Sequence, residues 1–561
     1  KYTRFYPDEE LFFYDVEVFP NLFIVAFKQY KKDEVTVWIN PGPDKIEWLM
    51  SKPLVGFNCR DYDNHVLYAA LLGEPIDKLY YISQGIIANN PNAKFGAAYN
   101  VSYADIYEYS STKKSLKKWE IEMDTVDHDE LGLPWDQPVP VELWPRVGEY
   151  CGNDVLATEA LFDHIYHDYT ARKIIATLSG LKVNDKTTSH AAAFLFGDEK
   201  RPQDKFVYTD LSKEFPGYTY SFGKSMYKGI DVGNGGIVYS KPGVYFEVAL
   251  EDVASMHPHS LIALNYFGPY TQRFADLVDT RILVKHGDYE KAKLMFDGAL
   301  AEFLTDKATA SALAYALKII INIVYGMTSA SFDNKFRHKD NHDNIVAKRG
   351  ALFMVDLLEA VEAKGFTVAH MKTDSIKIPN ATPEIIQFVH EFGAKYGYTF
   401  EHEHTYQRMA LVNKAVYIAQ LEDGTWSATG TTFAEPYVYK TLFSQEPIYE
   451  VDYAITKSVK GSAIYLGDKF VGRVAQVYAS KTGEEMWRVA EDKRGYVSGS
   501  KGYLWKQMNE FTSIDDVDMN YYEGLVAGAV EDIRLVGNPA EIIDPFKLKD
   551  RGWVADDADV A

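Results

Sequence analysis

Cysteine is scarce in this chain, with only Cys59 and Cys151 among 561 residues. Two cysteines are too few for a disulfide framework, which indicates a reducing compartment. No apolar run reaches the ~20 residues that cross a membrane, and the N-terminus lacks a signal-peptide pattern. These absences argue against a secreted or membrane-embedded protein, and we expect no membrane partner.

Positive charge is also in short supply, because the formal net charge is −21. Such a balance is unusual for a protein that binds nucleic acid, but binding depends on local patches and not on the total. One stretch departs from the average: from Lys457 to Lys506, ten Lys or Arg residues stand against five Asp or Glu. The sequence is therefore compatible with a basic groove on an acidic body.

What is present is the composition of a folded protein, with 47% hydrophobic and 14% aromatic residues. A chain of this length exceeds the ~250–300 residues of a single core, so several domains are expected. Strand patterns occur at Leu11–Asp15, Leu22–Phe27, Phe366–His370 and Ala415–Ala419, whereas Tyr270–Gly326 is mostly of helical pattern and the last helix is expected at Tyr521–Val530. The predicted fold class is multidomain, α/β followed by α+β.

The N-terminal part carries four carboxylates in a suggestive arrangement. Asp15 and Glu17 lie two residues apart in a predicted strand, so both side chains leave the same face. Asp63 follows, and Tyr150 and Asp154 share one face of a predicted helix. Four acids can hold two divalent ions that orient a water for hydrolysis. Taken singly, the strand pair would be a solvated edge and Asp154 a helix N-cap.

A second constellation lies further along the chain. Asp252 ends an apolar strand-like run, and Asp374 lies at the tip of a predicted hairpin. Lys318, Asn322 and Tyr325, at i, i+4 and i+7, share one helix face. Two-metal catalysis needs acids from distant parts of the chain and a cation for the phosphates, so these segments predict a phosphoryl-transfer site. Alone, the helical stripe would be a solvated face.

Three segments resemble the motifs of proofreading 3′→5′ exonucleases, which read Asp-x-Glu, Asn-x(3)-Tyr/Phe-Asp and Tyr-x(3)-Asp. They are Asp15–Glu17, Asn58–Asp63 and Tyr150–Asp154. Five more resemble elements of family B DNA polymerases: Tyr227–Gly229 (Tyr-x-Gly), Asp252–Pro258 (motif A), Lys318–Gly326 (motif B), Lys372–Ser375 (motif C) and Asn413–Tyr417 (Lys-x-Tyr). The chain thus resembles a compact, bacteriophage-encoded family B DNA polymerase with a 3′→5′ exonuclease.

The resemblance implies an RNase H-like exonuclease domain joined to a right-hand polymerase with palm, fingers and thumb. The implied limits are 1–165 for the exonuclease, 166–242 for a connector leading into the palm, 243–268 and 327–430 for the palm, 269–326 for helical fingers and 431–561 for the thumb and C-terminal DNA-binding region. The implied activity is template-directed DNA synthesis by a two-metal mechanism, with exonucleolytic proofreading.

Residue roles follow from the same resemblance. Catalysis would involve Asp252, Asp374 and Lys318 in the polymerase and Asp15, Glu17, Asp63, Tyr150 and Asp154 in the exonuclease. Metal ligands would be Asp252, Val253 and Asp374 at one site and Asp15, Glu17, Asp63 and Asp154 at the other. The dNTP would contact Ser255, Met256, His257, Arg281, Lys285, Lys318, Asn322 and Tyr325; DNA would contact Asn58, Tyr227, Gly229, Gly326, Lys414 and Tyr417.

The implied cofactor is Mg²⁺, two ions per active site, with Mn²⁺ as a substitute. The implied partners are primer–template DNA, dNTPs, a single-stranded DNA 3′ end in the exonuclease site and replisome accessory proteins. We expect a monomer in the cytoplasm of a bacterial host.

Several positions depart from the family pattern. His257 replaces the tyrosine that excludes the ribose 2′-hydroxyl, and Lys372 replaces the first acid of motif C. Ile323 stands where Ser is common, and one extra residue separates Lys414 from Tyr417. The segment from Asp252 to Lys318 has no room for the insertion of protein-primed relatives, so we expect a nucleic-acid primer and modest processivity.

Two alternatives remain open. In the first, only the exonuclease is active and the polymerase half holds DNA, which His257 and Lys372 motivate. In the second, the chain is a non-catalytic DNA-binding factor, which would leave six apparent metal-ligand acids without a purpose.

Overall fold

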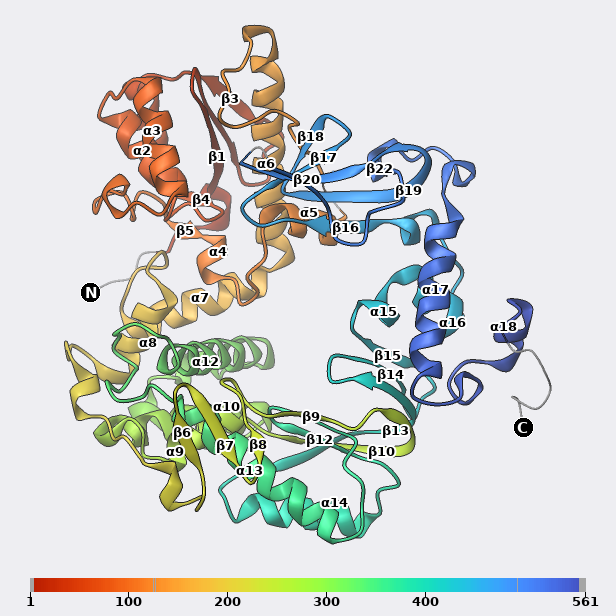
Figure 1. Ribbon diagram of the computed structural model, residues 1–561. Helices are drawn as coiled ribbons and strands as arrows, with labels where there is room; N and C mark the ends of the chain where they lie inside the picture. The colour runs from red at the N-terminus through yellow and green to blue at the C-terminus, as the bar shows by residue number, and fades with distance from the viewer. Residues whose placement is uncertain (1–4, 125, 127, 492, 554–561) are drawn as a thin grey trace.

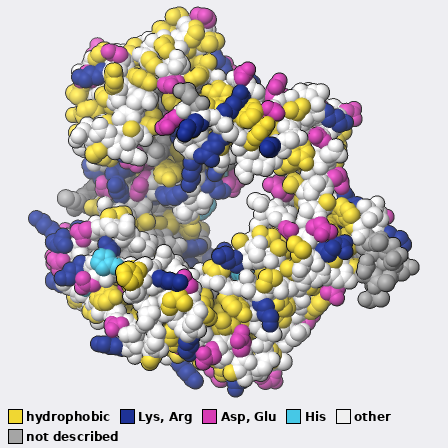
Figure 2. Space-filling view, viewed as in Figure 1, with side chains coloured by type: hydrophobic (Ala, Val, Ile, Leu, Met, Phe, Trp, Pro, Cys, Tyr) yellow, Lys and Arg dark blue, Asp and Glu magenta, His cyan; other side chains and the backbone are white. Residues whose placement is uncertain are grey.

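The computed structural model describes residues 5–124, 126, 128–491 and 493–553. Figure 1 shows an N-terminal α/β region above a larger lower body, with the C-terminal region completing the right side around a central gap. The gap persists as a hollow when side chains are drawn, and Lys and Arg side chains gather along its upper margin (Figure 2). An acidic chain thus presents basic groups toward its own centre.

The N-terminal region is a five-stranded sheet in the order β3-β2-β1-β4-β5 with helices on both faces (Figure 1). β1, β2 and β3 are antiparallel, whereas β1, β4 and β5 are parallel. All but the last residue of β2 are buried, as expected for a strand covered on both faces. The elements are η1 Asp8–Glu10, β1 Phe12–Phe19, β2 Leu22–Gln29, β3 Thr36–Ile39, α1 Pro43–Met50, β4 Leu54–Gly56, α2 Asp63–Leu71, α3 Ile76–Ile87, η2 Pro91–Ala93, β5 Ala104–Asp105, α4 Ile106–Tyr109, α5 Leu116–Met123, η3 Val141–Leu143 and α6 Trp144–His164.

A connecting region follows, with two helices and a small antiparallel sheet, β6-β7-β8. Its elements are α7 Tyr166–Ser179, α8 Thr187–Phe196, η4 Pro202–Lys205, η5 Leu211–Lys213, β6 Thr219–Ser221, β7 Lys224–Tyr227 and β8 Ile230–Asp231. The turn from β7 to β8 contains Gly229 at φ +79°, a left-handed conformation that glycine adopts without strain.

The lower body is built on a seven-stranded antiparallel sheet, β15-β14-β13-β10-β12-β11-β9. One face packs on α9, α13 and α14 in the largest hydrophobic core. The elements are β9 Val238–Ser240, β10 Gly243–Val253, α9 Met256–Ala263, α13 Ile345–Ala363, β11 His370–Lys372, β12 Ser375–Ile378, α14 Pro383–Ala394, β13 Phe400–Asn413, β14 Val416–Gln420 and β15 Trp426–Thr429. The strand predicted at Phe366–His370 is wrong for most of its length, because β11 begins only at His370.

Between α9 and α13, residues 268–328 are mostly helical, which confirms the prediction for Tyr270–Gly326. It contains η6 Gly268–Tyr270, α10 Thr271–Lys285, α11 Tyr289–Ala292, η7 Met295–Gly298, η8 Ala301–Phe303 and α12 Lys307–Thr328. Among the described helices, α12 alone has the length and hydropathy of a membrane span, so the expectation that no segment reaches that composition is wrong. Its packing against α7, α8 and α10 accounts for the apolar side chains, because those helices cover them.

The C-terminal region combines helices with two small antiparallel sheets, β16-β19-β22 and β18-β17-β20-β21. The basic stretch from Lys457 to Lys506 therefore folds as β-structure. The elements are α15 Thr431–Ala434, α16 Pro436–Leu442, η9 Glu450–Tyr453, β16 Ile455–Ser458, β17 Ala463–Leu466, β18 Lys469–Gly472, β19 Val474–Glu484, β20 Met486–Ala490, β21 Lys493–Tyr496, β22 Trp505–Gln507, η10 Met508–Glu510, η11 Ile514–Asp516, α17 Met519–Arg534, η12 Pro539–Glu541 and α18 Pro545–Asp550. The helix expected to be last, at Tyr521–Val530, lies within α17, and α18 follows it.

The N-terminal and C-terminal regions contact each other. The rings of Trp135 and Phe470 pack edge to face with centroids 5.7 Å apart, and the Arg473 guanidinium lies 5.4 Å from the Trp135 ring. α5 also contacts β19. The C-terminal sheets thereby brace the N-terminal region.

Gly483 in β19 offers a test of how the C-terminal region is packed. A Cβ at Gly483 would lie 2.4 Å from the backbone oxygen of Trp505, and backbone cannot rotate away. Gly483→Ala should therefore lower the free energy of unfolding by about 1–3 kcal/mol through overpacking. Urea denaturation would measure it, with Gly495→Ala in β21 as the control, since a Cβ there meets no atom within 4 Å. Equal stability of the two variants would contradict the close packing of β19 on β22.

Candidate active sites

The central sheet brings Asp252 and Asp374 together. Asp252 lies near the end of β10 and pairs with Ser375 of β12, and Asp374 occupies the turn that precedes β12. The Val253 N–H donates to the Asp374 carbonyl oxygen at 2.8 Å, which fixes the turn beside the strand. The predicted hairpin tip is confirmed. Asp252 and Asp374, which are far apart in sequence, meet where β10 ends and β12 begins.

The two carboxyls oppose each other electrostatically. Burial, then the charge of Asp374, raises the pKa of Asp252 to about 7. Burial also raises the pKa of Asp374. Two neighbouring carboxylates that repel each other are stabilised by a shared cation or by a retained proton. Carboxylate oxygens are also the ligands that Mg²⁺ prefers.

Sequence reasoning missed two further acids on β13. Glu401 pairs with Asp252 across the strands, and Glu403 lies at an irregularity in the register. The charge of Glu403 contributes to the raised pKa of both Asp252 and Asp374. The alternation Glu–His–Glu–His over residues 401–404 in a strand pattern was the available signal.

His257 and Tyr325 form the second feature of this site. Their rings stack in parallel, with centroids 3.9 Å apart and an interplanar angle of 7°. Burial lowers the pKa of His257 to about 4, so the imidazole is neutral at physiological pH. Ser255, at φ +52°, turns the chain from β10 into α9, and the buried Met256 anchors that turn. The segments Asp252–Pro258 and Lys318–Gly326 are therefore in direct contact.

The remaining residues predicted to bind dNTP lie on two packed helices. Lys318 and Asn322 are exposed on α12, as is Gly326, which was predicted to contact DNA. On α10, Lys285 is exposed, whereas Arg281 is half-buried with a lowered pKa and a buried Nε that makes no hydrogen bond among the described residues. α10 packs on α12, but binding of phosphate by Arg281 and Lys285 stays a prediction.

The predicted DNA contacts differ in exposure. Gly229 and Lys414 are exposed, and Tyr417 is half-buried. Tyr227 is buried and its hydroxyl donates to Asp356 of α13 at 2.8 Å, so its side chain packs inside the lower body and does not face outward. A DNA contact at this element would fall on the turn at Gly229.

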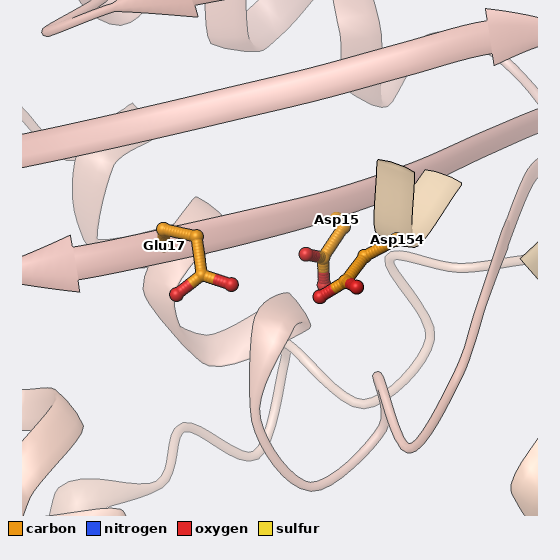
Figure 3. Close-up of side chains that lie close together, drawn as sticks. All are labelled: Asp15, Glu17 and Asp154. Atoms are coloured by element: carbon orange, nitrogen blue, oxygen red, sulfur yellow. The ribbon is translucent and has the colours of Figure 1, made fainter. Parts of the chain in front are cut away.

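The N-terminal acids form a separate cluster. Carboxylate oxygens of Asp15, Glu17 and Asp154 lie within 4.8 Å of one another. Figure 3 shows the three groups on one side of β1, with Asp15 facing Asp154 of α6. Burial, then the charge of Asp154, raises the pKa of both Asp15 and Glu17. Because Asp154 lies well inside α6, the N-cap alternative is wrong.

Asp63, at the start of α2, lies next to this cluster, and Asn58 lies in the loop that follows β4. An Asp63 oxygen accepts from the Val16 N–H at 3.2 Å, and burial raises the Asp63 pKa to about 7. Asn58 has φ +56°, and its N–H donates to Asp105 at 2.8 Å. The acids of this site thus come from β1, α2 and α6.

Lys117 of α5 is a member of the site that sequence reasoning missed. Its Nζ lies 2.5 Å from Asp154 Oδ1, 3.4 Å from Glu120 and 4.3 Å from the Tyr150 ring centroid. Burial alone would lower the Lys117 pKa, but the charges of Asp154 and Glu120 outweigh the effect of burial and raise this pKa. The basic run at 113–118 was the only sequence signal. This ammonium supplies positive charge where the carboxylates crowd.

Of the comparisons with known proteins, the one with solved structures found matches. No family model matches this chain, and no curated protein matches it. Among solved structures, the family B DNA polymerase of the hyperthermophilic archaeon Pyrobaculum calidifontis is similar over 95% of this chain and 79% of that chain, with a TM-score of 0.44 and 15% identity. A likeness at this level establishes neither family nor activity.

The crowded acids predict how divalent ions affect stability. Carboxyl pKa values raised above their ordinary range mean that the folded state holds protons more tightly than the unfolded one, so stability without metal should fall as pH rises from about 4 to about 7. Mg²⁺ should raise the melting temperature more at pH 8 than at pH 5.

Variants of both sites complete this test. Asp15→Asn/Glu17→Gln should reduce the Mg²⁺-induced shift in calorimetry, and adding Asp252→Asn should reduce it further. Asp33→Asn, at an exposed loop position, is the control. A shift that survives in the triple variant would contradict metal binding at these carboxylates.

Proposed function

We propose that this chain is a DNA-directed DNA polymerase with 3′→5′ exonuclease activity. The observation that carries the proposal is the meeting of separated segments: Asp252 with Asp374, and His257 with Tyr325, in one site. A second carboxylate cluster stands apart from it in the N-terminal region. Two acidic sites of this kind in one chain suit synthesis and proofreading.

The architecture supports this assignment. The order β3-β2-β1-β4-β5 with helices on both faces suits an RNase H-like exonuclease domain. The seven-stranded sheet would be the palm, α10 to α12 the fingers, and the region after about 430 the thumb, whose described part ends at 553. The hollow between them, with basic groups on its upper margin, would take primer–template DNA (Figure 2).

In the polymerase site, each residue has a definable task. Asp252, the Val253 carbonyl and Asp374 would hold Mg²⁺, which when bound lowers the pKa of a primer hydroxyl and neutralises triphosphate charge. Lys318 would neutralise charge that develops on the phosphates, assisted by Arg281 and Lys285.

The site also shapes the space for substrate. The stacked rings of His257 and Tyr325 would form the floor beneath the incoming nucleotide. A neutral imidazole there adds no charge next to the triphosphate. Asn322 and Gly326, exposed on the same helix, would line the approach of the nascent base pair.

In the exonuclease site, Asp15, Glu17, Asp63 and Asp154 would hold the metal ions. A metal ion would compete with Lys117 for Asp154, because the Lys117 ammonium lies 2.5 Å from Oδ1. Tyr150, next to Lys117, would orient the attacking water. The substrate would be the single-stranded 3′ end of a primer.

Binding of DNA would rest mainly on phosphate contacts and fall steeply with salt. We further propose a monomer with dNTPs and primer–template as partners and replisome proteins as accessories, encoded by a bacteriophage and acting in bacterial cytoplasm. Lys372, exposed beside Asp374, favours one alternative in which synthesis is lost and only the exonuclease acts.

Primer extension separates the two activities. Wild type with Mg²⁺ should extend a labelled primer when dNTPs are present and degrade it when they are absent. Asp374→Asn should abolish extension and keep degradation, and Asp15→Ala/Glu17→Ala should do the reverse. Degradation alone in wild type would refute synthesis and support the exonuclease-only alternative.

The stacked histidine predicts sugar discrimination. His257→Ala would remove the ring against Tyr325 and open space beneath the ribose, so ribonucleotide insertion relative to deoxyribonucleotide should rise by about 10-fold or more. Ratios of kcat/KM for rNTP and dNTP would measure it, with His286→Ala, at an exposed position after α10, as the control. An unchanged ratio would remove His257 from sugar selection.

A further inference from the structure

Lys377 is a buried cation on the same side of the sheet as Asp252. It lies in β12 with 3% of its surface exposed. Lys377 pairs with Leu250, and Ser375 pairs with Asp252, so alternation along the strands places Lys377 on the same face of the sheet as Asp252. Burying an ammonium is costly unless its partners compensate, so its contacts need explanation.

Lys377 contacts two side chains, those of His370 and Tyr417. The Lys377 Nζ donates to Nδ1 of the buried His370 at 3.1 Å, and it lies 4.8 Å from the centroid of the Tyr417 ring. Burial, then the charge of Lys377, lowers the His370 pKa to about 4, so the ring is neutral. The His370 Nε2–H can then donate to the Lys414 carbonyl oxygen at 3.0 Å.

Both sets of contacts reach the turn between β13 and β14 and the start of β14. Lys414 lies in that turn with an exposed side chain, and Tyr417 follows it in β14. Lys377 therefore links β12, which follows Asp374 directly, to this turn by a cation–π contact and by a hydrogen-bonded relay through His370. The pairing register shifts between Leu411 and Asn413, so the strand pairing next to this turn is irregular.

We propose that Lys377 is a positioning residue for the primer end: it holds the Lys414–Tyr417 turn at a fixed place relative to Asp252 and Asp374. This inference rests on the proposed polymerase function. If Lys414 and Tyr417 hold the primer strand, their distance from the carboxylates decides whether the 3′-hydroxyl reaches the reacting phosphate. A displacement of about 1 Å at such a point can cost ~100-fold in rate.

Lys377→Met is the main test, because methionine fills similar space without the charge or the donor. On a primer–template, its maximal rate of single-nucleotide insertion should fall roughly 10–100-fold, with little change in KM for dNTP. Degradation of a single-stranded oligonucleotide by the same preparation should stay at the wild-type rate, since that site lies in another domain. Lys395→Met, an exposed lysine beyond α14, is the control and should match wild type in both assays.

A double variant tests the relay. His370→Phe should lower the insertion rate alone, and Lys377→Met/His370→Phe should lose no more than the worse single variant, because both act through one network. Losses that multiply, or wild-type insertion by Lys377→Met, would overturn the inference. Parallel loss of insertion and degradation would indicate general destabilisation and overturn it too. Failure of wild type to insert nucleotides would instead refute the proposed function.

Discussion

Repulsion between partly buried carboxylates is the constraint on which both candidate sites depend. At the central sheet, pairing of β10 with β12 holds Asp252 beside Asp374, and burial raises the pKa of both. At the N-terminal sheet, Asp15, Glu17 and Asp154 are held within 4.8 Å. Such arrangements oppose folding at neutral pH, so the surrounding packing and hydrogen bonds must stabilise them.

The two sites manage this repulsion differently. In the N-terminal site, Lys117 touches Asp154 directly, so a bound cation must compete with a resident ammonium. In the central site, Lys377 lies in the strand after Asp374, engaged with His370 and Tyr417. We therefore expect the central carboxylates to be more available to a metal ion than Asp154, because no ammonium contacts them as closely among the described residues.

α12 contributes both to the hydrophobic core and to the candidate nucleotide-binding surface. Its apolar residues are covered by α7, α8 and α10, and its exposed stripe carries Lys318 and Asn322. Stacking of Tyr325 on His257 fixes the helix relative to the end of β10. The same helix therefore joins the core of the lower body to the floor of the site, and a shift in its packing would move the nucleotide-binding side chains.

The sequence by itself determined the strands around Asp15 and Asp252, the helix that carries Lys318, and the hairpin tip at Asp374, because period-2 and period-3.6 patterns are local. It also identified most acids of both clusters through short motifs. Only the tertiary structure brought in Lys117, Glu401, Glu403 and the Lys377–His370 relay, which lie outside those motifs. The tertiary structure also showed that Tyr227 is buried. It further showed that α12 is apolar because it packs against other helices. The reason is physical: a side chain's charge state and contacts depend on what the fold packs around it, and strand pairing joins residues that no local pattern relates.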